Sequence, residues 1–239
     1  MRVKGRNAVR EALNSNVNII KIMASRSSKD RVFEELISLA NSKRIKVQFV
    51  DNKVLDSECD NHQGIIAITS DYEYSTVDDI LAVAKEKNEP NFILILDGIE
   101  DPHNFGSIIR VAECLGVHGI IISKNRACPV TDTVSKVSAG AIEHVKIAKV
   151  TNINTEIERL KKLGVWVYAC ELGGDDLDKS DLSGNIAIVM GSEGKGVSRL
   201  TRELCDGVVT MEMKGKVNSL NVSVATGIVL YEAVRKRGK

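Results

Sequence analysis

The chain has 239 residues, and its 33 Lys and Arg nearly balance its 32 Asp and Glu, so the formal net charge is only +1. This length exceeds the commonest domain size, and we expect two modest domains that each bury a core. No stretch approaches the roughly 18 apolar residues that span a bilayer, and the first residues lack the apolar segment of a secretory signal. These features predict a cytoplasmic protein with no membrane partner.

Cysteine and histidine spacing gives no sign of a disulfide framework or a metal centre. The five cysteines are odd in number and scattered, with no C-x-x-C pair. The four histidines lack the i, i+4 spacing of a zinc-binding helix. We therefore expect reduced cysteines and no metal ion.

Basic residues gather at the start of the chain. Residues 1–70 contain 12 Lys and Arg against 8 Asp and Glu, whereas the remainder contains 21 against 24. Arg2, Lys4 and Arg6 all precede the first acidic residue, and this density favours contacts with RNA phosphates. A solvated basic helix explains the charge alone equally well.

The first 70 residues predict a compact α/β unit. Apolar spacing indicates, in order, a helix over 6–13, a strand over 18–24, a helix over 29–41, a strand over 46–50, a short helix over 53–58 and a strand over 65–69. Residues 71–91 are polar and carry one amphipathic helix over 76–87. We expect them to form a linker that contains this helix.

A second apolar core is predicted to begin at Phe92. Residues 92–96 are a continuous apolar run, which is typical of a strand covered on both faces in a parallel sheet. The elements expected after it are helices over 107–115, 131–139, 153–163 and 219–236, and strands over 119–123, 165–170, 186–190 and 207–211. Strands that alternate with helices indicate a doubly wound α/β sheet.

Three polar segments follow or open these elements. They are Asp101-Pro102-His103-Asn104-Phe105-Gly106 with Arg110, Gly191-Ser192-Glu193-Gly194-Lys195-Gly196, and Ser219-Leu220-Asn221-Val222-Ser223. Sheets of the α/β class usually place their ligands where buried strands end. We therefore expect the three segments to form one shared site.

Neither common nucleotide-binding motif is present. A P-loop needs a glycine where Val189 stands and a serine or threonine where Gly196 stands. A dinucleotide-binding fingerprint needs a third glycine where the chain has Arg199. The sequence therefore indicates neither a P-loop NTPase nor a Rossmann dehydrogenase.

The order and spacing of the three segments resemble the motifs of the SpoU (TrmH) family. The matching residues are Asn104, Gly106 and Arg110, then Met190 to Gly196, then Ser219 to Ser223 with Ala225. Members of this family are S-adenosylmethionine-dependent RNA ribose 2′-O-methyltransferases of the SPOUT class. The resemblance extends over about residues 92–236.

The resemblance also implies a domain organisation. Residues from Val3 to Leu13, and Gln63-Gly64-Ile65, are similar to the small L30e-like RNA-binding domain of one branch of the family. The implied order is an L30e-like α/β domain that binds substrate RNA over 1–70, a linker with its helix over 71–91, and a SPOUT α/β methyltransferase domain over 92–239. The family's fold further implies a deep trefoil knot in the last domain.

The family's motifs imply the functional residues. Backbone at Gly191, Met211 and Leu220 is expected to bind S-adenosylmethionine. The implied catalytic residues are Arg110, Asn104, Glu193 and Asn221, and the expected RNA contacts are Ser219, Arg2, Lys4 and Arg6. Because an arginine keeps its proton at ordinary pH, we expect Arg110 to bind a phosphate and stabilise the developing oxyanion rather than act as a general base.

Some features leave alternatives open. Asn104 taken alone is equally well explained as the N-cap of the helix that carries Arg110. Glu212 stands where the nearest relatives commonly have proline, and Asn218 stands where they have a small residue.

The branch with an L30e-like domain implies a homodimer, formed through the catalytic domain, that methylates a guanosine of 23S rRNA. Relatives that methylate tRNA commonly lack such a domain, so a tRNA guanosine is the second candidate. A non-catalytic RNA-binding or ribosome-assembly protein on the same fold is the third.

Overall fold

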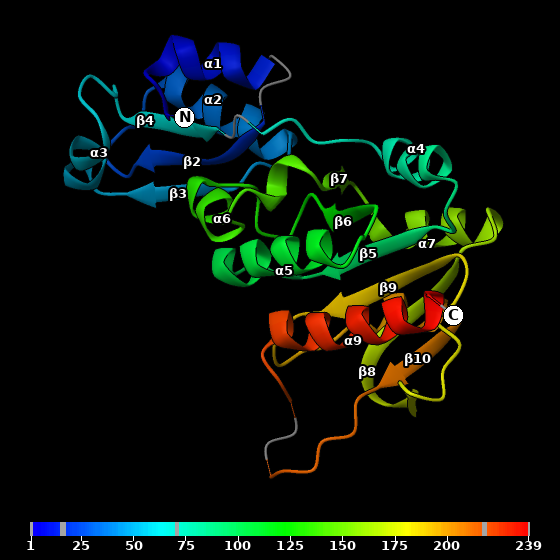
Figure 1. Ribbon diagram of the computed structural model, residues 1–239. Coiled ribbons are helices and arrows are strands. Elements are labelled where there is room, and N and C mark those ends of the chain that lie inside the picture. The colour runs from blue at the N-terminus through cyan, green and yellow to red at the C-terminus, as the bar shows by residue number, and fades with distance from the viewer. Residues whose placement is uncertain (1, 15–17, 70–71, 217–218, 239) are drawn as a thin grey trace. The chain divides into compact units, whose positions relative to one another are not determined.

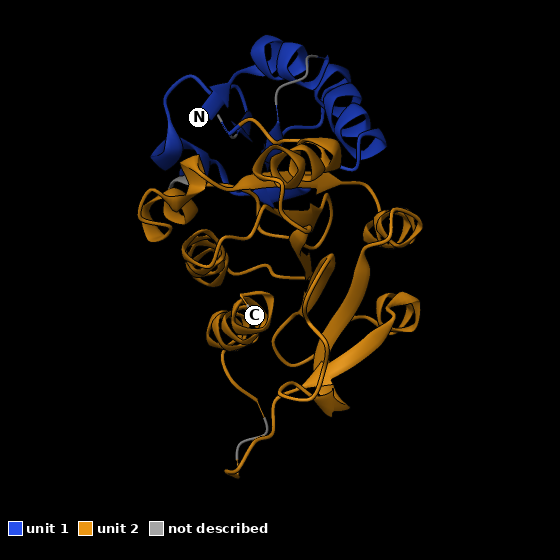
Figure 2. Ribbon diagram, turned by 45° about the vertical axis from the view of Figure 1, so that its right-hand side comes forward, with its two compact units in different colours: residues 1–72 blue, residues 73–239 orange. Residues whose placement is uncertain are grey.

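The computed structural model describes residues 2–14, 18–69, 72–216 and 219–238. The chain divides into two compact units, residues 1–72 and 73–239 (Figure 2). Most of the segment predicted as a linker therefore belongs to the second unit. Within the described ranges, no helix is both long enough and apolar enough to cross a membrane.

The first unit is built on a four-stranded mixed sheet (Figure 1). Its order is β1-β4-β2-β3, with β4 antiparallel to β1 and β2, and β3 parallel to β2. The elements are β1 (Arg2–Lys4), α1 (Arg6–Asn14), β2 (Ile19–Ser25), α2 (Arg31–Ser42), β3 (Val47–Val50), α3 (Asn52–Glu58) and β4 (Ile65–Thr69). The sequence predicted all of them except β1, which is too short to show a strand period.

The second unit is built on a six-stranded parallel sheet of order β10-β8-β9-β5-β6-β7. Its strands are β5 (Phe92–Asp97), β6 (Gly119–Ser123), β7 (Lys146–Val150), β8 (Trp166–Asp176), β9 (Ile186–Gly191) and β10 (Gly207–Thr210). Its helices are α4 (Val77–Lys87), α5 (Pro102–Cys114), α6 (Asp132–Val137), η1 (Ala141–Glu143), α7 (Ile153–Lys162), α8 (Arg199–Leu204) and α9 (Val222–Arg237).

Helices cover both faces of this sheet, which confirms the predicted α/β architecture. Apolar residues of α4 and α7 pack on one face in a single core cluster with β5, β6, β8 and β9. On the other face, α5 packs against α6 and α9, and α9 contacts β9 (Figure 1). Residues 92–96 of the central strand β5 are all at most 2% exposed. Burying such a side chain contributes roughly 1.5–3 kcal/mol.

The structure differs from the predicted elements at several places, among them the short helix η1, which was not predicted, and β8, which runs to Asp176 and not to residue 170. Strand β7 was not predicted, because Lys146 and Lys149 interrupt its apolar pattern at the sheet edge. Helix α8 has six residues and was also missed. Helix α5 begins at Pro102, five residues earlier than predicted, because proline fits the first helical turn and the Asp101 side chain caps it.

The trefoil knot implied by the resemblance stays a prediction. What the structure gives is the route of the chain after β10: residues 211–216 extend away from the sheet before the chain returns to α9 (Figures 1 and 2).

A buried histidine joins the starts of β5 and β6. His118 is 2% exposed, and its Nδ1 accepts a hydrogen bond from the backbone N–H of Phe92 at 3.1 Å. A backbone N–H can only donate, so Nδ1 is unprotonated and Nε2 donates to Glu89 Oε2 at 3.0 Å. Burial lowers the pKa of His118 in spite of Glu89, and Lys87 and Arg237 add to this lowering. The imidazole is therefore neutral in the folded chain.

We expect this histidine to make folding sensitive to mild acid. Its folded pKa lies below the ordinary value of 6.5, so the unfolded chain binds the proton first, and stability falls as pH drops below about 6.5. Asn can still accept from Phe92 but does not titrate, so His118→Asn should lose less stability than the wild type between pH 7.5 and 5.5. Urea unfolding at both pH values measures this, and equal losses in the two proteins would contradict it.

Candidate functional site

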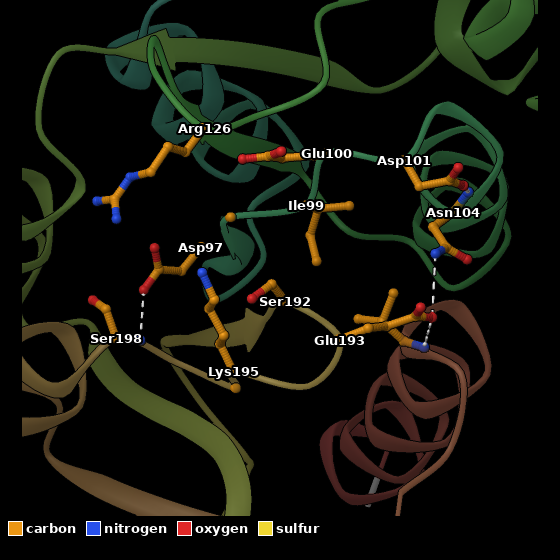
Figure 3. Close-up of a pocket in the computed structure, with 13 residues that line it drawn as sticks. Asp97, Ile99, Glu100, Asp101, Asn104, Arg126, Ser192, Glu193, Lys195 and Ser198 are labelled. Atoms are coloured by element: carbon orange, nitrogen blue, oxygen red, sulfur yellow. Dashed lines mark hydrogen bonds between the residues drawn. The ribbon is translucent and has the colours of Figure 1, made fainter.

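Polar residues at the carboxyl ends of β5, β6 and β9 surround a cavity of about 420 Å³ (Figure 3). Residues 97–101 and Asn104 contribute from β5 and the start of α5, and Arg126 from the loop after β6. The segment after β9 contributes Ser192, Glu193, Lys195, Gly196 and Ser198, and α9 contributes Val222. Strand β5 lies beside β9 with Asp97 paired to Gly191, which explains why these segments meet.

Three of the predicted catalytic residues form one hydrogen-bonded cluster. Asn104 Nδ2 donates to Glu193 Oε1 at 3.2 Å, and Asn221 Nδ2 donates to the same oxygen at 2.7 Å. Asn221 Nδ2 also donates to Asn104 Oδ1 at 2.8 Å. Asn104 and Glu193 line the cavity, so this cluster brings all three polar segments together at its edge.

Helix caps hold the two amides in place. The Asp101 side chain accepts from the backbone N–H of Asn104 at 2.8 Å and caps α5, so of the two alternatives left open for Asn104 the N-cap role is wrong. Asn221 caps α9, accepting from the backbone N–H of Ser223 at 3.0 Å. The backbone N–H of Val222 also donates to Glu193 Oε1, at 3.3 Å. Glu193 Oε1 thus accepts three hydrogen bonds.

A tight turn presents Glu193. The backbone groups of Ser192 and Gly196 exchange two hydrogen bonds, at 3.1 and 2.9 Å. Gly191 lies so close to this turn that an added Cβ would be 2.0 Å from the Gly196 carbonyl carbon. The glycine of the first motif has a different role, because a Cβ on Gly106 would be 2.7 Å from Val137 Cβ on α6. It allows α5 and α6 to pack closely.

The sequence did not indicate Arg126, which lines the cavity together with Lys195 of the second polar segment. Both side chains are exposed, and Arg126 has a left-handed backbone with φ 54°. Figure 3 shows Arg126 on the side of the cavity opposite Asn104. In the sequence, Arg126 is marked only by its place after a predicted strand. It reaches the cavity because that strand, β6, pairs with β5 and ends at the same sheet edge.

The remaining predicted residues of the second unit lie outside the cavity lining. Arg110 is exposed on α5, eight residues after Pro102, and does not join the amide cluster. Met211 is half-buried, and Ser219 and Leu220 are exposed. Glu212 pairs with Lys214, and Asn218 lies outside the described residues.

The predicted RNA contacts of the first unit are partly paired with acids. Arg2 Nε lies 2.8 Å from Glu58 Oε2, and Arg6 makes two hydrogen bonds to Asp30, at 2.8 and 2.7 Å. Lys4 is exposed on β1. Arg6 also lines a second cavity, of about 410 Å³, in this unit. The basic density therefore remains at the surface, although ion pairs compensate part of its charge.

Metal ligation and thiol chemistry were the other possibilities for His, Cys, Asp and Glu in the part of the chain that the structure describes. No three His, Cys, Asp or Glu side chains there lie close enough to hold a metal ion. Burial raises the pKa of the Cys128 and Cys170 thiols to about 11 and of the Cys205 thiol to about 12. These cysteines are therefore poor nucleophiles at neutral pH.

Comparison with protein families gives two matches that together span most of the chain. The SpoU rRNA Methylase family matches residues 91–231. The domain described as RNA 2′-O ribose methyltransferase substrate binding matches residues 2–75.

Relatives with similar sequences carry the same assignment along their full length. YacO of Bacillus subtilis (strain 168), provisionally named a TrmH family tRNA/rRNA methyltransferase, is 44% identical over 98% of this chain and 95% of its own. A Staphylococcus saprophyticus protein with the same provisional name is 44% identical over 98% and 95%.

Solved structures agree with this assignment. An AdoMet-bound rRNA methyltransferase from Sinorhizobium meliloti has 26% identity and a TM-score of 0.61, covering 98% of this chain and 86% of its own. The A. aeolicus TrmH/SpoU tRNA modifying enzyme has 29% identity and a TM-score of 0.58, covering 63% of this chain and 77% of its own. With both units matched and the three motifs meeting at one cavity, the chain belongs to the SpoU/TrmH family of RNA 2′-O-ribose methyltransferases.

Proposed function

We propose that this protein transfers a methyl group from S-adenosylmethionine to the ribose 2′-hydroxyl of a guanosine in 23S rRNA. The observation that carries the proposal is the cluster of Asn104, Glu193 and Asn221 at the edge of the cavity. Three segments distant in sequence converge there, and their polar groups are fixed before any substrate binds. Such preorganisation is what alignment of two reacting groups requires.

The carboxyl ends of β8, β9 and β10 fit the cofactor. Gly191 allows the turn after β9 to pack against the end of the strand, since no side chain fits beside Gly196, and the Sinorhizobium meliloti relative is described as AdoMet-bound. We assign Gly191, Met211 and Leu220 to cofactor binding through their backbone. Bound S-adenosylmethionine would supply an electrophilic methyl group on its sulfonium sulfur.

The amide cluster is suited to orienting the ribose. Three donors fix Glu193 Oε1, while Oε2 accepts no hydrogen bond from any described residue. That oxygen is available to accept from a ribose hydroxyl and hold it toward the cavity. Asn104 and Asn221 keep the carboxylate in this orientation, and Ser219 is proposed to contact the RNA nearby.

Arg110 is proposed to bind the phosphate beside the target ribose and to stabilise the oxyanion that develops on the 2′-oxygen. Its guanidinium stays charged, so it donates hydrogen bonds and does not remove the proton. The proton passes to the phosphate or to water. Arg2, Lys4 and Arg6 of the first unit are proposed to bind phosphates of the substrate RNA.

The share of this chain that each solved structure matches supports rRNA over tRNA as the substrate. The structure described as an rRNA methyltransferase aligns with 98% of this chain, including the first unit. The one described as a tRNA modifying enzyme aligns with only 63%. The extra domain is thus shared with the rRNA enzyme.

An apolar stripe on α9 supports a homodimer formed through the second unit. Val224, Ile228 and Tyr231 are 51%, 43% and 59% exposed, and their spacing places them on one face of the helix. Large exposed apolar side chains in a row mark interaction surfaces. Light scattering in solution should return twice the 26.1 kDa mass of one chain, and the mass of a single chain would contradict the dimer.

The test is incubation of the full-length protein with labelled S-adenosylmethionine and unmodified 23S rRNA or tRNA, followed by nucleoside mass spectrometry. The expected product is 2′-O-methylguanosine in 23S rRNA. Label in tRNA alone would change the substrate but keep the chemistry. No label in either RNA, with no cofactor binding by calorimetry, would overturn the enzyme proposal in favour of a non-catalytic RNA-binding protein.

A further inference from the structure

Strand β8 leaves regular pairing with β10 toward its carboxyl end. Tyr168 and Ala169 pair with β10, but the next residue of β10 pairs with Asp175. Residues 170–174 therefore have no partner on β10, although Cys170 still pairs with β9, and β8 bulges after Cys170. Bulges of this kind are frequent beside active sites, where they redirect a side chain.

The bulge carries an acid, Glu171, next to the predicted cofactor glycine. Cys170 pairs with Met190 on β9, so Glu171 lies at the level of Gly191. Its carboxylate rests against the turn after β9, because a Cβ on Gly196 would be 2.6 Å from Glu171 Oε1. Gly196 lines the cavity. The Glu171 carboxylate thus lies against Gly196, the last residue of this turn.

One oxygen of this carboxylate is not used by the fold. Glu171 Oε2 is buried and accepts no hydrogen bond within the described part of the chain. Arg202 Nε on α8 lies 3.6 Å away, which is too far for a hydrogen bond. The guanidinium therefore balances the negative charge without supplying a donor. A buried acceptor left in this state is costly.

The chemistry of the missing partner follows from that charge balance. Arg202 already balances the negative charge of Glu171, so a second cation is not needed. The unpaired oxygen still needs a hydrogen-bond donor, and a neutral one is sufficient. The side chain keeps 24% of its surface exposed, and rotation of a terminal carboxylate is soft, so either oxygen can turn toward a ligand. A carboxylate with two oxygens suits the paired hydroxyls of a ribose.

We propose that Glu171 binds the ribose hydroxyls of the adenosine moiety of S-adenosylmethionine. This inference rests on the proposed function, since it assumes a cofactor at the edge formed by β8, β9 and β10. It adds a side-chain contact to a site otherwise assigned to backbone. It also explains why the last residue of the Gly191 to Gly196 segment must lack a side chain.

The test is calorimetry on the full-length protein with two probes, S-adenosylhomocysteine and 5′-methylthioadenosine, the second of which has the ribose but no amino-acid end. Glu171→Gln keeps the shape of the side chain. It should lower the affinity for both probes roughly tenfold, which is the usual effect of losing a hydrogen bond to a charged group. Arg202→Gln is the matched control, because it removes the half-exposed ion pair but keeps the acid, and it should bind both probes like the wild type.

Each other outcome has a distinct meaning. Unchanged affinity of Glu171→Gln for both probes would overturn the inference alone. Weakening of S-adenosylhomocysteine but not of 5′-methylthioadenosine would place the acid at the amino-acid end and overturn the ribose assignment. If Glu171→Gln does not fold, judged by thermal unfolding, Glu171→Asp provides the same comparison. Failure of the wild type to bind S-adenosylhomocysteine would instead be a failure of the proposed function.

Discussion

Replacing Arg110 with alanine is expected to slow methyl transfer to RNA by a factor of about 10² to 10³, the usual effect of removing one donor to a developing oxyanion. The side chain is exposed on α5 and makes no ion pair within the described ranges. Its loss should therefore leave the fold and the binding of S-adenosylhomocysteine unchanged. Single-turnover rates with RNA, together with calorimetry, separate the two effects.

Arg110→Lys is the stricter form of this test. Lysine keeps the positive charge but cannot reproduce the planar two-pronged contact that a guanidinium makes with a phosphate. We expect it to recover only a small part of the lost rate. Near-normal turnover by Arg110→Lys would contradict the proposed role, because charge alone would then be sufficient.

The Arg110 side chain does not line the cavity of its own chain, so the proposed role requires it to contact RNA that extends beyond the cavity or RNA in the site of a second copy. The next residue, Val111, packs near Gly227 of α9, beside the apolar stripe proposed as the dimer surface. Mixing the slow Arg110→Ala protein with Glu193→Ala protein distinguishes the two, because activity rises above that of either variant alone only if chains share a site.

Convergence of the three motifs was predictable from sequence for a physical reason. Parallel strands end at the same edge, so polar residues after β5 and β9 had to meet there. The exact start of α5 was not predictable, since Asp101 and Asn104 are both good N-caps and Pro102 decides between them. The strands predicted from continuous apolar runs are buried, as expected. The edge strand β7 was not predicted because two lysines interrupt its apolar pattern.

The parts of the site that sequence reasoning missed depend on contacts without a local signal. Arg126 lines the cavity only because β6 is the neighbour of β5, and strand order is not visible in a single sequence. Glu171 reaches Gly196 only because β8 bulges after Cys170. Both residues would be interpreted as solvated charges without the fold.

Replacing Gly191 with alanine is expected to weaken cofactor binding roughly 100-fold. The new Cβ would be 2.0 Å from the Gly196 carbonyl carbon and 2.2 Å from the Val197 nitrogen. These are backbone atoms, fixed by the two hydrogen bonds between Ser192 and Gly196, so the turn must move as a whole. Overpacking of this kind costs about 3 kcal/mol, and about 3 kcal/mol corresponds to a loss of roughly 100-fold in affinity.

The same displacement would also move Glu193 away from Asn104 and Asn221, so Gly191→Ala should lose methyl transfer even at saturating cofactor. Gly194→Asn is the matched control in the same turn. Gly194 has φ 80° with open space around its Cβ position, and asparagine tolerates that backbone. The control should therefore bind S-adenosylhomocysteine nearly as the wild type does. Calorimetry that finds wild-type affinity in Gly191→Ala would show that the cofactor does not depend on this turn.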